Sequence, residues 1–236
     1  MVLDESGSIG RKNWRKVKKF VRHVISRFSV APFGAHFAAV KYNNRPRKVF
    51  SLTKYTNAKK LRKAVRRMRY RGGGTRTGKA MRFTNRKILW GKDDRKDVPN
   101  VVVLVSDGKS HDHSKAVREA RKMKQKGVKI LCVGIGRGRK VDRLIKKLQE
   151  ISSKPEYTFK TTMNALDTIE NSLVKDMCEP ISKNCEVPKL CPVEPFAKKG
   201  CYRTPKPHTA TLLFNRRNQI DWEDGWDNFI EKIVHE

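Results

Sequence analysis

The chain has 236 residues and a formal net charge of +32 at pH 7. Hydrophobic residues make up 37% of it and charged residues 33%, which fits a globular protein with a heavily charged surface. No apolar run approaches the roughly 20 residues that a membrane-spanning helix needs, which argues against a self-anchored protein. The length predicts one α/β domain with a sizeable core, followed by a smaller unit.

The first predicted strand is the apolar pair Val2-Leu3, which leads directly into a polar run. A central strand typically has about five residues, so we expect part of this strand, and any signal peptide, to lie upstream of residue 1. The polar run reads D-x-S-x-S and places the carboxylate of Asp4 and the hydroxyls of Ser6 and Ser8 on one turn. Taken alone, such a run is most simply a helix N-cap, because Asp and Ser accept hydrogen bonds from the free amides of a first turn.

Helical and strand patterns then alternate to about residue 177. Apolar residues at helical spacing between Trp14 and Phe28 predict an amphipathic helix. Strands at Phe37–Tyr42 and Val49–Leu52, joined by a turn at 43–46, are expected to form an antiparallel hairpin at the sheet edge. Alternation of this kind specifies a doubly wound, mostly parallel sheet with helices on both faces. The remaining predicted helices are 58–68, 78–89, 114–125, 142–151 and 163–177, and the remaining strands are 101–106, 128–134 and 157–161.

Two later segments carry more oxygen donors. The glycine-rich loop before the helix at 78–89 contains Thr75, and the strand 101–106 is followed by Asp107. Because open α/β sheets bind ligands at the carboxyl ends of their strands, we expect these residues to converge with Asp4. A set of carboxylates and hydroxyls suits Mg²⁺, Mn²⁺ or Ca²⁺ and is poor for Zn²⁺. Few protein ligands also leave open positions on the metal.

Together and in this order, the three segments resemble the von Willebrand factor type A (vWA) domain with its metal-ion-dependent adhesion site (MIDAS), of the extracellular matrix type found in matrilins and collagens. The resemblance covers roughly residues 1–177 and implies a Rossmann-like vWA fold. It implies that Ser6 and Ser8 bind the metal directly, Asp4 and Asp107 directly or through water, and Thr75 in the ligand-engaged state. Mg²⁺ is the favoured ion, with Mn²⁺ or Ca²⁺ as alternatives. The matching runs are Leu3 to Gly10, Gly74 to Ala80, Ser106 to Ser110, and Val133 to Gly136.

The resemblance also implies a function. In this family a carboxylate from the bound partner often supplies the last metal ligand, so the metal is part of the binding surface and no reaction is implied. We therefore expect a secreted, non-enzymatic adhesion module of the extracellular matrix. Its partner would be a protein ligand, collagen-like or acidic.

The charge points to a second function. Between Met1 and Trp90 the only acidic residues are Asp4 and Glu5, and the predicted helix 58–68 carries basic residues around much of its circumference. These like charges repel one another. The basic surface of this helix is therefore either simply solvated or bound by an acidic partner. The candidates are a sulfated glycosaminoglycan, acidic matrix, an anionic mineral surface or nucleic acid, although no interleaved aromatic residues support single-strand recognition. Binding of this kind would survive EDTA and fall with salt, whereas MIDAS binding would not survive EDTA.

The same charge is expected to weaken the metal site. A unit charge about 10 Å away contributes roughly 0.4 kcal/mol in bulk water, so a few basic neighbours approach a tenfold loss of cation affinity. We therefore expect weak Mg²⁺ binding by the free domain, strengthened by an acidic partner, and a sub-micromolar Mg²⁺ affinity without partner would contradict this. The candidate neighbours are Arg11, Arg76, Lys79 and Lys109.

The cysteines divide by context. Cys132 lies in the strand 128–134 and is expected to be a buried thiol. The other four fall in or after a Pro- and Lys-rich tail, and their spacing fits no standard zinc pattern, so disulfides are the better interpretation. Residues 178–200 are predicted to be a linker and 201–236 the start of a second, incomplete extracellular module. The family resemblance implies that Cys178 pairs with a cysteine upstream of the first strand. The tail cysteines are Cys178, Cys185, Cys191 and Cys201.

Two other motifs are rejected. The run from Gly73 to Lys79 satisfies G-x-x-x-x-G-K, but Ala80 stands where a phosphate loop needs Ser or Thr to hold Mg²⁺. The run His111-Asp112-His113 could suggest a metal cluster, yet Ser110 or Asp112 capping the helix that follows is the favoured role. The sequence shows no credible catalytic pair, so we do not expect an enzyme.

Overall fold

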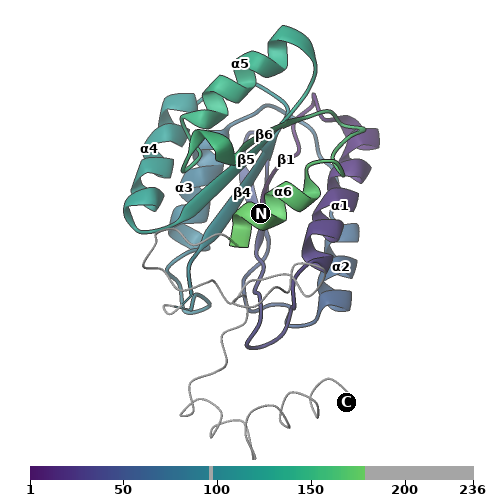
Figure 1. Ribbon diagram of the computed structural model, residues 1–236, viewed down its shortest axis with the longest axis vertical. Coiled ribbons are helices and arrows are strands. Elements are labelled where there is room, and N and C mark those ends of the chain that lie inside the picture. Colours follow the sequence, from purple (N-terminus) through teal and green to yellow (C-terminus); the bar gives the residue numbers. More distant parts are fainter. Residues whose placement is uncertain (96–97, 179–236) are drawn as a thin grey trace, which may run out of the picture. The chain divides into compact units, whose positions relative to one another are not determined.

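Six strands form one sheet in the computed structural model, which describes residues 1–95 and 98–178 (Figure 1). The strand order is β3-β2-β1-β4-β5-β6. Every neighbouring pair is parallel except the β2–β3 hairpin at one edge. The predicted α/β fold with an antiparallel edge strand is therefore confirmed. The strands are β1 Val2–Asp4, β2 Ala39–Tyr42, β3 Pro46–Phe50, β4 Val101–Ser106, β5 Lys129–Ile135 and β6 Thr158–Thr161.

Six α-helices flank the sheet and divide between its two faces. Alternate residues of β4 show the division, because Val103 and Val105 pack in one buried cluster with α1, α2 and α6. Val102 and Leu104 pack in the other cluster, with α3, α4 and α5. Figure 1 shows the same two groups of helices on opposite sides of the strands. The helices are α1 Gly10–Ser26, α2 Ala58–Arg66, α3 Thr77–Lys87, α4 His113–Gln125, α5 Gly138–Gln149 and α6 Glu170–Cys178, with a short 3₁₀ helix at Pro155–Tyr157.

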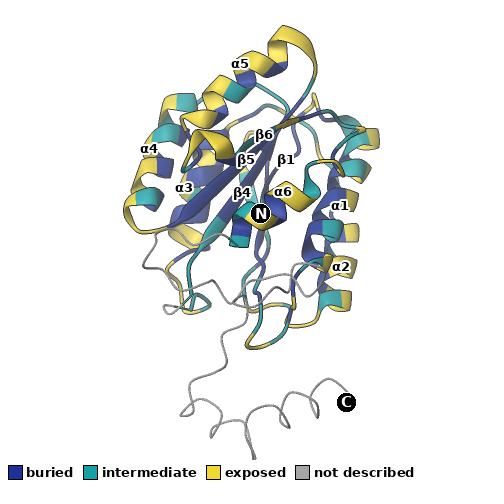
Figure 2. Cartoon of the chain, viewed as in Figure 1, coloured by how far each residue is buried: buried dark blue, intermediate teal, exposed yellow. Residues whose placement is uncertain are grey.

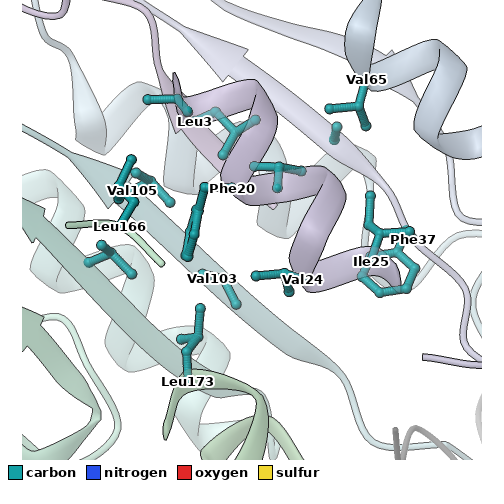
Figure 3. Packing of buried hydrophobic residues seen from close by; sticks show 14 of the residues in the cluster. Leu3, Phe20, Val24, Ile25, Phe37, Val65, Val103, Val105, Leu166 and Leu173 are labelled. Carbon is teal, nitrogen blue, oxygen red and sulfur yellow. The ribbon is translucent and has the colours of Figure 1, made fainter. Parts of the chain in front are cut away.

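The core on the α1 face is built from the apolar stripe of α1. Phe20, Val24 and Ile25 are at most 3% exposed and lie over the strands, as Figure 3 shows. Leu173 of α6 joins the same cluster. The outward faces of the helices are exposed (Figure 2). None of the helices in the described part of the chain is long and apolar enough to cross a membrane.

Some element boundaries differ from the predictions. The strand predicted at 49–52 is β3 Pro46–Phe50, and the helix predicted at 142–151 is α5 Gly138–Gln149. The helix predicted to begin at residue 163 begins at Glu170, because residues 162–169 form turns. In these turns the hydroxyls of Thr161 and Thr168 both donate to the Ala165 carbonyl, at 2.7 and 2.8 Å. Local bonds of this kind offer the backbone an alternative to the helical ladder. The edge strand β3 begins at Pro46, a residue that sheets tolerate at an edge.

Cys132 is buried in β5 and its thiol is free, as expected. Burial raises the pKa of this thiol, so it is an inert core residue rather than a nucleophile. Cys178 is half-buried at the end of α6 and packs against the core cluster of the α1 face. The other tail cysteines and the predicted second module lie outside the described residues, as does any upstream partner of Cys178.

Candidate metal centre

The candidate site lies where the two central strands end. Asp4 is the last residue of β1 and Ser106 the last of β4, and these strands are neighbours with Leu3 opposite Val105. The carboxyl ends of parallel strands thus bring the D-x-S-x-S turn and the Ser106-Asp107 segment to one place. This is the convergence that the sequence predicted.

Asp4 is a buried carboxylate with few partners. It is 1% exposed, accepts a hydrogen bond from the Ser6 amide at 2.9 Å and another from the Ser106 hydroxyl at 2.8 Å. Burial raises the pKa of Asp4 to about 6, and the nearby charge of Asp107 adds to this, while the hydrogen bonds lower it. The ionised form is therefore under-compensated in the protein alone.

Ser6, Ser8 and Asp107 form a chain of polar contacts beside Asp4. The Ser6 and Ser8 hydroxyl oxygens are 3.0 Å apart, and Ser8 donates to Asp107 Oδ1 at 2.8 Å. Burial also raises the pKa of Asp107, against the lowering effect of its Ser8 contact. Four of the five predicted ligands thus lie within one connected group, while their role in binding a metal stays a prediction.

Thr75, the fifth predicted ligand, lies on a loop fastened to this group. The Gly7 amide donates to the Gly73 carbonyl at 2.7 Å, which joins the loop to the D-x-S-x-S turn. On the other side, the His111 amide donates to the Thr75 carbonyl at 2.9 Å. Thr75 is 6% exposed. Among the described residues, its hydroxyl does not take part in the hydrogen bonds that link Ser6, Ser8 and Asp107. Its part in binding a metal stays a prediction.

Glycine is needed where the loop passes Asn43. Gly73 has a φ of 108°, which L side chains rarely adopt, and a Cβ there would lie 3.3 Å from Asn43 Nδ2. Asn43 fixes the loop at both ends, because its side chain donates to the Gly72 carbonyl and its carbonyl accepts from the Arg76 amide at 3.1 Å. The end of β2 therefore positions the loop that carries Thr75.

The prediction that Ser110 or Asp112 caps α4 is wrong, because both side chains cap α3 instead. Asp112 accepts from the amides of Gly78 at 2.8 Å and Lys79 at 2.9 Å, and the Ser110 hydroxyl accepts from the Thr77 amide at 3.2 Å. The side chain of Asp112 makes no capping hydrogen bond to α4, the helix that it precedes. Sequence spacing cannot predict a cap whose side chain comes from a distant segment. This cap joins the Thr75 loop to the segment after β4.

Glu5 is a residue of the site region that the sequence analysis did not single out. Its side chain is fully buried, 2.8 Å from Lys41 Nζ and 3.5 Å from an Arg47 guanidinium nitrogen. Lys41 also donates to the Arg69 carbonyl at 2.6 Å, just before the glycine loop. A signal existed, because Lys41 interrupts an otherwise apolar strand and Glu5 is one of only two acids in the first 90 residues. The pairing itself depends on the β1–β2 register.

The donor set fits a hard divalent cation. Its members offer two carboxylates and three hydroxyls, all oxygen, as Mg²⁺, Mn²⁺ and Ca²⁺ prefer. Within the described residues there is no group of three or more His, Cys, Asp or Glu side chains that could hold a metal, so a histidine or cysteine zinc site is not found there. Burial raises the pKa of both Asp4 and Asp107, and within the described residues neither carboxylate forms an ion pair with a basic side chain.

Comparison with known proteins agrees with this fold. A family model described as the von Willebrand factor type A domain matches residues 1–172. Human collagen alpha-5(VI) chain is 33% identical over 187 residues, which are 78% of this chain and 7% of that protein. Mouse matrilin-2 is 30% identical over 188 residues, 75% of this chain and 19% of that protein. This chain therefore spans a small part of the length of these relatives.

A solved structure shares the fold. Proximal thread matrix protein 1 from the mussel byssus, described with a zinc-occupied MIDAS motif, aligns with a TM-score of 0.65. The alignment is 24% identical and covers 73% of this chain and 45% of that chain. At this identity the likeness supports the fold.

We expect Asp4→Asn to stabilise the metal-free protein at neutral pH. The folded-state pKa of about 6 lies above the ordinary value of 3.8, so the stabilising contribution of the protonated carboxyl is complete below about pH 4 and lost as pH rises through 6. At pH 7.5 the variant's free energy of unfolding should exceed that of the wild type by about 3 kcal/mol. Urea unfolding in EDTA from pH 4 to 8 should show the variant's advantage growing with pH. An advantage that does not change over this range would contradict the burial effect, and Asp167→Asn, at an exposed position, is the control.

We expect Glu5→Gln to destabilise the fold by about 3–5 kcal/mol, because it leaves the Lys41 ammonium buried without its carboxylate. Adding Lys41→Met to the same protein should recover part of the loss, since both buried charges are then gone. Asp142→Asn breaks the exposed pair with Lys160 and serves as the control, with a cost below about 1 kcal/mol. Chemical unfolding measures all three. Equal costs for Glu5→Gln and Asp142→Asn would refute the role given to Glu5.

Proposed function

This chain belongs to the von Willebrand factor type A domain family, and from this premise we propose that it is a non-enzymatic extracellular matrix module that binds an acidic protein ligand through a divalent cation. One observation carries the proposal. The side chains of Asp4, Ser6, Ser8 and Asp107 meet at the ends of the central strands as an all-oxygen group with two under-compensated carboxylates.

Each residue has a part in this proposal. Ser6 and Ser8 would bind the cation directly, Asp4 and Asp107 directly or through water, and Thr75 when a ligand is engaged. The bound cation would supply a Lewis-acidic position for a carboxylate of the partner. We favour Mg²⁺, and because the mussel protein is described with zinc at its MIDAS motif, Mn²⁺, Ca²⁺ and Zn²⁺ belong in the same titration.

The surroundings support an acidic partner. Arg11, Arg76, Lys79 and Lys109 are all exposed, and each lies in or beside a segment that forms the site. Their positive field attracts a ligand carboxylate and opposes a free cation. Metal and ligand binding would therefore be mutually reinforcing in this protein.

The extracellular setting is part of the proposal. The relatives named collagen alpha-5(VI) and matrilin-2 are matrix proteins, and the cysteine-rich tail of this chain suits an oxidising environment. We take residues 1–177 as the vWA domain, 178–200 as a linker and 201–236 as the start of a second module. Collagen is the first ligand to test, because the family resemblance suggests it.

We expect the full chain to bind immobilised fibrillar collagen in Mg²⁺ and to lose this binding in EDTA. Asp107→Ala should weaken the Mg²⁺-dependent binding at least about tenfold, because one charge-assisted contact to the cation is lost. Asp142→Ala removes the same charge from exposed α5 and is the matched control. Surface plasmon resonance gives the affinities. Binding that is equal in Mg²⁺ and EDTA, and equal in Asp107→Ala, would refute the proposal.

A further inference from the structure

Residues 1–90 present basic side chains to solvent and no carboxylate. The only acids in this range are Asp4 and Glu5, which are 1% and 0% exposed. Basic residues are frequent on the outward surfaces of α1 and α2, the exposed regions of these helices in Figure 2. The positive charge of this surface is therefore not balanced by acids from the same half of the domain.

Two basic stripes lie on neighbouring helices. Helices α1 and α2 pack side by side (Figure 1). The Lys18 ammonium of α1 donates to the Arg66 carbonyl of α2 at 2.7 Å. Each stripe follows the spacing i, i+3, i+4, i+7, which places its members on one side of a helix. We name these eight residues the α1–α2 basic face: Arg15, Lys18, Lys19 and Arg22 on α1, and Lys59, Arg62, Lys63 and Arg66 on α2.

The charges of this face are not neutralised within the described residues. None of the eight forms an ion pair with a carboxylate there, whereas the basic residues of α5 and its neighbourhood are interleaved with acids, as in the pairs Lys147–Glu150 and Lys160–Asp142. The first turns of α1 and α2 also lack the acids that the helix dipole favours. Burial, followed by the charges of Arg15 and Arg22, lowers the pKa of Lys18. Like charges held this close cost stability, and an anionic partner would relieve that cost.

The shape and chemistry of the face select among polyanions. Helix α1 has 17 residues and is therefore about 25 Å long, which suits a linear polymer with repeated anionic groups. Its large aromatic residues, Trp14 and Phe20, are buried, so the face offers no platform on which nucleic-acid bases could stack. Lysine and arginine supply the charged donors that sulfate oxygens accept. The matrix relatives favour an extracellular polymer over nucleic acid.

We propose that the α1–α2 basic face binds a sulfated glycosaminoglycan, at a site separate from the metal centre and independent of metal. The metal centre lies at the ends of β1 and β4, and none of the eight residues is among its predicted ligands. The chain would thus hold two kinds of ligand, a carboxylate at the cation and a sulfated polymer along two helices.

The test uses heparin as the probe, with the full chain in EDTA. One variant carries Lys59→Gln, Arg62→Gln, Lys63→Gln and Arg66→Gln. The control carries Arg139→Gln, Lys140→Gln, Arg143→Gln and Lys146→Gln on α5, which changes the net charge equally. Glutamine is a good helix former, so both should stay folded, as circular dichroism would verify. A second test variant, Arg15→Gln with Lys19→Gln, probes the α1 stripe.

Wild-type protein should bind heparin in EDTA with an affinity that falls steeply with NaCl. The α2 variant should bind about tenfold more weakly or worse, and the slope of log affinity against log salt should drop by about one for each contact removed. The α5 control should stay within about threefold of wild type. Asp107→Ala should bind heparin like wild type in EDTA, so failure here is distinguishable from failure of the metal-dependent function.

Several results would overturn the proposal. Equal losses in the α2 and α5 variants would mean that total charge, not this face, determines binding. Equal binding of heparin and unsulfated hyaluronan would remove the role of sulfate. Tighter binding of duplex DNA than of heparin would assign the face to nucleic acid. Loss of heparin binding in Asp107→Ala would show that the two sites are not separate.

Discussion

The carboxylate of Asp4, buried at the end of a central strand, is the constraint around which the site is arranged. Burial disfavours its charge, and the protein offers it only an amide and a hydroxyl, with a second carboxylate nearby. The turn at 4–8, the glycine loop and the segment after β4 all meet beside it. Burying two neighbouring carboxylates costs stability, and under our proposal a bound cation offsets that cost.

Glu5, the neighbouring residue, is a buried carboxylate that does have basic partners. Glu5 is as deeply buried as Asp4, yet Lys41 and Arg47 lie beside it. Glu5 is thus neutralised inside the protein and joins β1 to β2, whereas Asp4 has no ion pair with a basic side chain within the described residues. Under our proposal, Glu5 is a structural charge and Asp4 a metal-binding one, although the two are adjacent in sequence. Through Lys41 and Asn43, the end of β2 also holds the segment that carries Thr75.

The sequence was informative wherever a strand ended on a polar residue. Periodicity and strand ends were enough to predict the sheet, its antiparallel edge and the meeting of Asp4 with Asp107, since parallel strands end at one edge. Contacts between segments were not predictable in this way. Asp112 caps α3 rather than α4, and Glu5 finds Lys41 through strand register, because both depend on tertiary packing rather than spacing. The late start of α6 has a local cause, the threonine hydroxyls that hold the preceding turns.

The central claim is that a divalent cation binds at the meeting point of the D-x-S-x-S turn, the Thr75 loop and Asp107. Paramagnetic Mn²⁺, titrated into ¹⁵N-labelled protein, tests it directly, because amides close to the ion lose their NMR signals. We expect the amides of Gly7, Ser8, Gly74 and Gly108 to broaden first and those of α2 and α5 to stay sharp, with the effect reversed by EDTA and absent in Asp107→Ala. Broadening centred elsewhere, or none at millimolar Mn²⁺, would contradict the account.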